Sequence, residues 1–152
     1  STLFPYTTLF RSSYYNAVVM CFGVNDGYHV LGEWNSTDET TIMGQFNKII
    51  NYIYTQNKQI RVIVFAPFNG RNAGTFPDYW YGERNREYVS RKILSDTLKR
   101  ACDYYWVPYV EQYDCPINQL NITEALPDGT HPSNNYYRLL SDWVAAKVNG
   151  LL

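Results

Sequence analysis

Three short apolar segments, with longer segments of helical periodicity between and after them, constrain the fold of this chain more than any other feature. Residues 17–22 and 60–66 are almost wholly apolar, and residues 107–112 form a third segment that is short and less apolar. Continuous apolar runs of this length are typical of strands that are buried on both faces of a parallel sheet. The sequence therefore predicts three strands that enter one buried sheet.

Apolar residues at helical spacing predict helices over residues 35–56, 83–105 and 134–148. Ser36 and Glu39 have the spacing of a capping box at the start of the first helix. The residues expected on the inner faces are Ile42, Phe46, Ile49, Ile50 and Ile53, then Val89, Ile93, Leu94 and Leu98, and finally Leu139, Leu140, Trp143 and Val144.

This alternation of strands and helices predicts an α/β three-layer sandwich with a parallel sheet, because right-handed crossovers place helices on both faces. In such folds, ligands bind beyond the carboxyl ends of the strands. Polar stretches follow each predicted strand, at residues 23–26, 68–82 and 126–132. We therefore expect these three stretches to meet at one edge of the sheet.

Asp128 and His131 form the first candidate site, in the stretch LPDGTHP at residues 126–132. An Asp three residues before a His, with Gly between, can contact the imidazole on one tight loop. The carboxylate then fixes the tautomer and leaves the other ring nitrogen free to accept a proton, as a general base requires. The alternative is a polar loop that caps the last helix through Ser133 or Asn134.

Gly23 and Asn25 form a second candidate site, directly after the first predicted strand. They lie just past the carboxyl end of that strand, where ligands bind in such folds. The alternative is that Asn25 and Asp26 form a side-chain-stabilised turn that ends the strand.

Composition narrows the class of protein without identifying it. The net charge of −1 gives no reason to expect nucleic acid as a partner, and no apolar run reaches the ~20 residues of a membrane span. Cys21 and Cys102 are expected to be small core residues, and three cysteines in all cannot pair completely. No ligand cluster with suitable spacing predicts a metal or other cofactor, and the cellular compartment stays open.

The first residues of the chain are expected to have a separate origin. Residues 2–12 read TLFPYTTLFRS, which resembles the conceptual translation of a sequencing-adapter oligonucleotide. A segment of this kind is excluded from fold reasoning, as a tag would be. We therefore expect the natural sequence to begin at about Ser13, with residues 13–152 as one truncated domain.

Residues 23–26 (GVND) after a buried strand, and residues 128–132 (DGTHP) before a final helix, resemble two signature blocks of the SGNH, or GDSL-type, hydrolases. The resemblance extends from Ala17 to about Val148. It implies a flavodoxin-like sheet that lacks its first strands. It also implies hydrolysis of an acyl ester, with no metal or organic cofactor.

The resemblance also implies a role for each matching residue. His131 is the expected general base and Asp128 its orienting carboxylate, while Asn25 donates to the oxyanion and Gly23 lets the backbone turn beneath it. The family's nucleophile, a Ser in a Gly-Asp-Ser block, has no counterpart in this sequence. We therefore expect this chain to be the C-terminal part of such an esterase, inactive as it stands.

The substrate is left open by the sequence. An aromatic stretch at residues 76–81, which includes Trp80, tilts the expectation toward an acylated carbohydrate, and His29 is a second candidate substrate contact. The alternative is a non-catalytic α/β module, either carbohydrate-binding or structural, in which His131 has no chemical role.

Overall fold

The computed structural model of the chain describes residues 15–23, 26, 29–67, 91–112, 115–118, 120–129 and 131–152. Its elements are β1 (Ala17–Cys21), α1 (Ile42–Gln56), β2 (Arg61–Phe65), α4 (Arg91–Tyr105), β3 (Tyr109–Val110), α5 (Ile122–Ala125) and α6 (Asn134–Leu151). The three strands are parallel and lie in the order β1-β2-β3. The predicted α/β class and parallel sheet are confirmed.

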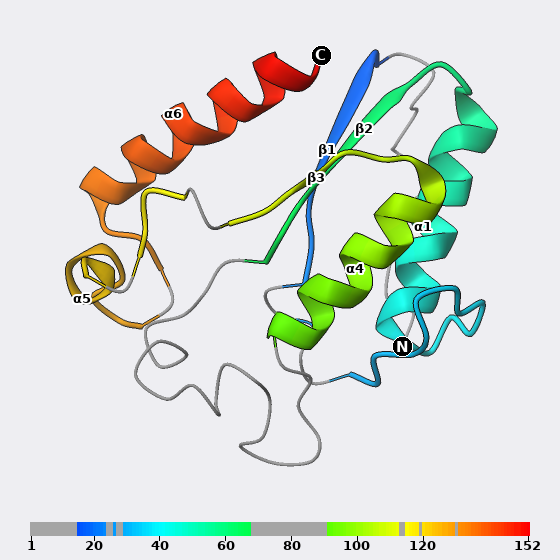
Figure 1. Cartoon of the computed structure of the whole chain (residues 1–152), viewed down its shortest axis with the longest axis horizontal. Coiled ribbons are helices and arrows are strands. Elements are labelled where there is room, and N and C mark those ends of the chain that lie inside the picture. The colour runs from blue at the N-terminus through cyan, green and yellow to red at the C-terminus, as the bar shows by residue number, and fades with distance from the viewer. Residues whose placement is uncertain are drawn as a thin grey trace.

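The central strand β2 is buried on both faces, which is why its sequence is continuously apolar. Val62 and Val64 pack with α1 and α4 on one face of the sheet, whereas Ile63 and Phe65 pack against α6 on the other. Figure 1 shows α1 and α4 together on one side of the strands and α6 apart from them. The helices thus form the outer layers around the sheet.

The larger core lies between the sheet and the pair α1 and α4. Phe46 and Ile50 of α1 and Leu94 and Leu98 of α4 are almost fully buried there. Each such side chain contributes about 1.5–3 kcal/mol through removal of apolar surface from water. Gly23, two residues after the end of β1, lies against Leu94 of this core.

Helix α1 begins later than its sequence predicts. The predicted capping box of Ser36 and Glu39 is wrong, because Thr41 is the N-cap and its Oγ1 accepts from the N–H of Gly44 at 3.0 Å. The N–H groups of Ile42 and Met43, which have no acceptor within the helix, donate to the carbonyls of Val30 and Leu31. Backbone carbonyls from earlier in the chain therefore accept the N–H groups at the start of the helix.

Three of the residues predicted to be in the core are exposed. Ile93 and Leu139 lie on the solvent side of α4 and α6. Cys21 is exposed together with Val19 on β1, because α6 covers β2 and β3 on that face. Of the other predicted core residues, Val89 lies outside the described residues.

Two further elements differ from expectation. The third strand, β3, is restricted to Tyr109–Val110, and a short helix, α5, occupies part of the connection predicted to be irregular. Within the described part of the chain, no helix has both the length and the apolarity needed to cross a membrane.

Candidate active site

The loop of residues 126–133 joins α5 to α6, and a small apolar cluster packs where it meets the two helices. Ile122, Ala125, Leu126 and Tyr136 form this cluster, with Ile117 packed against it. The N–H of Ser133 donates to the carbonyl of Ala125 at 2.8 Å, which ties the end of the loop to its start. The loop is thus tied at both ends, while the side chains of Asp128 and His131 are exposed.

Asp128 and His131 contact each other across this loop, as their spacing predicts. Asp128 Oδ2 lies 2.7 Å from His131 Nδ1, and Asp128 Oδ1 accepts the backbone N–H of His131 at 2.7 Å. Gly129, with φ of 89°, lets the chain turn tightly between them. Both oxygens of one carboxylate therefore orient one histidine, through its ring and through its backbone.

The ring of His131 is arranged to accept a proton. A carboxylate can only accept at Nδ1, so in the neutral ring the proton sits on Nδ1 and Nε2 has the lone pair. The side chain of His131 is 72% exposed, so Nε2 is open to an incoming group. This is the geometry of a histidine base paired with an orienting carboxylate.

Gly23, two residues after the end of β1, has a conformation that favours glycine. Its φ is 102°, and a Cβ at this position would lie 2.6 Å from Leu94 Cδ2. The next described residue, Asp26, accepts the N–H of His29 through its carbonyl at 3.0 Å. Gly23 is thus a close-packed position just after the first strand, and its predicted role in an oxyanion site stays a prediction.

The remaining predicted site residues are not brought to this loop by the described structure. Asn25 and Trp80 lie outside the described residues. His29 is exposed, and among the described residues no hydrogen bond or ion pair links it to His131. Across the part of the chain that is described, no cluster of three or more His, Cys, Asp or Glu side chains could bind a metal.

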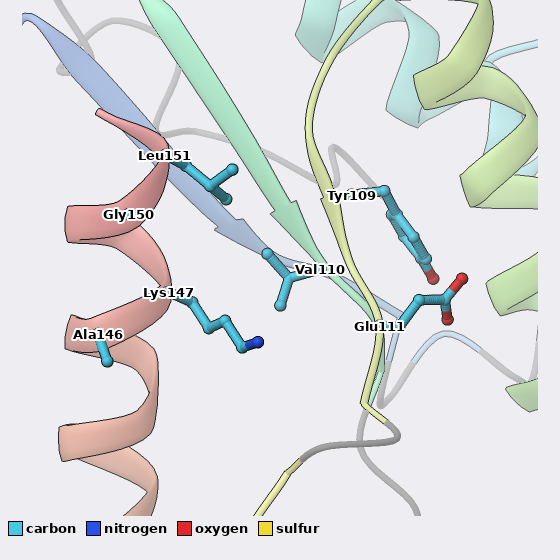
Figure 2. A pocket seen from close by; sticks show the side chains of 7 residues that line it. All are labelled: Tyr109, Val110, Glu111, Ala146, Lys147, Gly150 and Leu151. Atoms are coloured by element: carbon cyan, nitrogen blue, oxygen red, sulfur yellow. The ribbon is translucent and has the colours of Figure 1, made fainter.

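A groove between β3 and α6 was not predicted from the sequence. Its volume is about 560 Å³, and it is lined by Tyr109, Val110, Glu111, Ala146, Lys147, Gly150 and Leu151. Figure 2 shows Lys147 reaching from α6 toward Val110, whereas Tyr109 and Glu111 point to the opposite side of β3. Residue 146 is twelve residues beyond the start of α6 at Asn134, or about 18 Å at 1.5 Å per residue, so the groove is remote from His131.

Comparison with known proteins gives structural likeness alone. No protein-family profile matches the sequence, and no curated protein matches it. One crystal structure, 25% identical in sequence, superposes with a TM-score of 0.74 over 89% of this chain, which spans 64% of that protein's length. A protein of Lactobacillus plantarum, 16% identical, superposes with a TM-score of 0.75 over 92% of this chain and 69% of its own.

A third similar structure is described as a possible lipase from Chitinophaga pinensis. It is 16% identical and superposes with a TM-score of 0.53 over 66% of this chain and 43% of its own. At this identity the likeness shows the fold, and the chain is accordingly an α/β protein of the same architecture as these neighbours.

Proposed function

We propose that this chain is the C-terminal part of an SGNH-type serine esterase that hydrolyses acyl esters. The observation that carries the proposal is the Asp128–His131 pair, with 2.7 Å between Oδ2 and Nδ1 on a supported loop that precedes the last helix. The resemblance of residues 23–26 and 128–132 to two family blocks, and the fold shared with a possible lipase, support it further.

In the proposed reaction, a serine from a preceding Gly-Asp-Ser block attacks the ester carbonyl. His131 Nε2 takes the proton of the serine hydroxyl, and Asp128 stabilises the imidazolium that results. The negative charge on the carbonyl oxygen is stabilised by the side-chain amide of Asn25. His131 then gives its proton to the departing alcohol, and the acyl group stays on the serine.

The second half of the reaction releases the acyl group. Water attacks the acyl-serine ester while His131 accepts a proton from that water and later returns it to the serine oxygen. The products are a carboxylic acid and the free enzyme. Division of the hydrolysis into two steps through a covalent intermediate is what a serine nucleophile contributes.

The chain as it stands is proposed to lack the nucleophile. Among the described serines, Ser36 bonds Thr41, Ser95 bonds Tyr109, and Ser141 donates to the carbonyl of Tyr137. None of these three is hydrogen-bonded to His131. We propose that residues 2–12 are foreign and that residues 13–152 continue a longer natural protein, in keeping with the greater length of the structural neighbours.

An acylated carbohydrate is the proposed substrate class, with His29 and Trp80 as contacts to it. The aromatic stretch at residues 76–81 is the basis for this choice. A non-catalytic carbohydrate-binding or structural module is the alternative, and the two differ in whether an acyl-enzyme forms.

The test is to restore the natural upstream sequence and to incubate the complete protein with a short-chain acyl ester. Mass spectrometry should show a serine that carries the acyl group, together with release of the alcohol. The 152-residue chain is the control and should show neither, because loss of a triad nucleophile lowers turnover by about 10⁶. Glycan binding by the complete protein without any hydrolysis would favour the non-catalytic module.

A further inference from the structure

A cluster of aromatic rings and one arginine lies on the outer side of α4, separate from the candidate active site. The ring centroids of Trp34 and Tyr104 are 5.1 Å apart, and the Arg100 guanidinium lies 5.1 Å from the centroid of Trp34. Tyr104 also contacts Tyr105 edge-on at 5.2 Å. Single exposed apolar residues are ordinary on protein surfaces, whereas a contiguous patch calls for a reason.

The position of Trp34 is fixed by a buried amide. Asn47 of α1 donates through Nδ2 to the carbonyls of Trp34 at 3.0 Å and of Ser36 at 2.9 Å. Asn51, one turn further along α1, donates to the hydroxyl of Tyr105 at 3.4 Å. These bonds hold the segment that carries Trp34 against the two helices, so the ring is preorganised next to Arg100 and Tyr104.

Arg100 differs from the lysines of the same helix in what it contacts. Lys92 pairs with Asp96, and Lys99 pairs with Asp103 at 3.1 Å. No carboxylate among the described residues pairs with Arg100, whose described partner is the face of Trp34. Stacking on a ring leaves the N–H groups at the edge of the guanidinium available, and their fork matches a carboxylate.

Trp106 is a further exposed ring and lies close to Tyr104 along the chain. It lies two residues after Tyr104, hence within about 7 Å along the backbone, and it is 92% exposed. Its φ is 56°, a left-handed conformation that disfavours a side chain of this size. Packing within the described structure does not offset that cost, since so little of the ring is buried.

We propose that the aromatic–arginine surface, made of Trp34, Arg100, Tyr104 and Trp106, binds an acidic polysaccharide built from uronic acid residues. Sugar rings present flat C–H faces that stack on exposed aromatic rings, and a uronate carboxylate accepts the paired N–H groups of Arg100. The combination of two exposed rings, Tyr104 and Trp106, with one cation that has no carboxylate partner among the described residues favours an anionic sugar over a neutral one.

The surface lies away from the proposed catalytic loop. Tyr104 and Trp106 are at the end of α4, just before β3 begins, so they belong to the amino edge of the parallel sheet. The loop of residues 126–133 follows the carboxyl ends of the strands, and Figure 1 shows the end of α4 on the opposite side of the sheet from α6. The inference therefore does not depend on the ester hydrolysis proposed above.

The test is affinity electrophoresis of the complete protein in gels that contain polygalacturonate or its methyl ester. The two polymers share one backbone and differ in charge. We expect retardation by polygalacturonate that weakens with added salt, and much weaker retardation by the methyl ester. Equal retardation by both polymers would overturn the role of Arg100, and none by either would overturn the proposal.

Variants connect the binding to these residues. Arg100→Gln should lower the affinity for polygalacturonate fivefold or more and remove its salt dependence, whereas Arg138→Gln, an exposed arginine on α6, should change neither. Trp106→Asn should lower the affinity by a similar factor and melt no lower than the wild type, because Asn tolerates positive φ. Tyr137→Ala, which removes an exposed ring on α6, is the matched control and should bind normally.

Two results separate polysaccharide binding from catalysis and from self-association. His131→Ala should keep full affinity for polygalacturonate, so a failure of the catalytic proposal leaves this one standing. Trp, Tyr and Arg are also enriched where protein chains associate. If sedimentation shows a dimer that Arg100→Gln or Trp106→Asn dissociates, and polygalacturonate does not compete, the surface is an interface between copies and the polysaccharide proposal is wrong.

Discussion

The substitution Gly23→Ala tests whether the turn after β1 requires glycine. The added Cβ would lie 2.6 Å from Leu94 Cδ2 and 3.4 Å from Leu94 Cγ, at a φ of 102°. Positive φ costs a residue with a Cβ about 1–2 kcal/mol, and overpacking of a filled core costs about 1–3 kcal/mol. We therefore expect a loss of about 2–5 kcal/mol, which is a large part of the stability of an ordinary domain.

A double-mutant cycle separates the two contributions. Leu94→Ala alone should cost about 2–5 kcal/mol, because it leaves a cavity among buried side chains. In the double variant the clash with Leu94 is gone. Its loss of stability should therefore be about 1–3 kcal/mol smaller than the sum of the two single-variant losses. The part of the Gly23→Ala loss that persists in the double variant is the cost of positive φ at residue 23.

The assay is urea unfolding of the complete protein, with tryptophan fluorescence as the readout. Gly150→Ala is the control, because Gly150 lies in α6 without positive φ, and a Cβ added there would meet no atom within 4 Å. That change should leave stability unchanged or raise it by less than about 1 kcal/mol, since Gly150 lies near the end of the helix. If Gly23→Ala changes stability no more than an ordinary surface substitution, or if its cost adds fully to that of Leu94→Ala, the described turn is wrong.

Three further predictions concern stability and association. Thr41→Ala removes the N-cap of α1 and should lower the unfolding free energy by about 1 kcal/mol, whereas Thr40→Ala, at an exposed neighbour, should cost less. Burial raises the pKa of Cys102 to about 12, so the protonated thiol favours the folded state, and this contribution is lost as pH rises from the unfolded pKa near 9 toward 12. The unfolding free energy should therefore fall by about 1 kcal/mol between pH 7.5 and pH 10. The variant Cys102→Ala should lack this fall. The 152-residue chain expressed alone should aggregate, because β1 pairs only with β2 in the described sheet and its free edge is apolar and uncharged; a monodisperse monomer with a cooperative melt would contradict this.

The architecture was predictable because it follows from local patterns. The apolar run that includes Val62–Phe65 can be buried only if both faces of the strand are covered, and that condition leads to a parallel sheet between helices. The contact between Asp128 and His131 was predictable for the same reason, since the two residues are three positions apart with a glycine between them.

Features that depend on distant segments were not predictable. The start of α1 depends on carbonyls of Val30 and Leu31, which reach it through the folded loop and not through the helix sequence. The exposure of Cys21 depends on which strands α6 covers. Likewise, the contact of Trp34 with Arg100 joins residues far apart in the chain, so no local pattern indicated it.

The catalytic assignment leads to graded losses of turnover among variants of the complete protein. Asp128→Asn should cost less than His131→Ala, because the imidazole remains but is misoriented. Asn25→Ala should lower turnover more than it weakens substrate binding, since its hydrogen bond strengthens only in the transition state. Both variants are measured by steady-state kinetics with the same acetyl ester.

The most direct test of the catalytic role of the Asp128–His131 pair is the turnover of His131→Ala in that assay, beside His29→Ala. Loss of the base should lower turnover by about 10⁶, as it does in comparable serine hydrolases. His29→Ala should retain turnover, because His29 is a proposed substrate contact and takes no proton. If His131→Ala keeps near-normal turnover while His29→Ala is inactive, the pair described here is not the catalytic base.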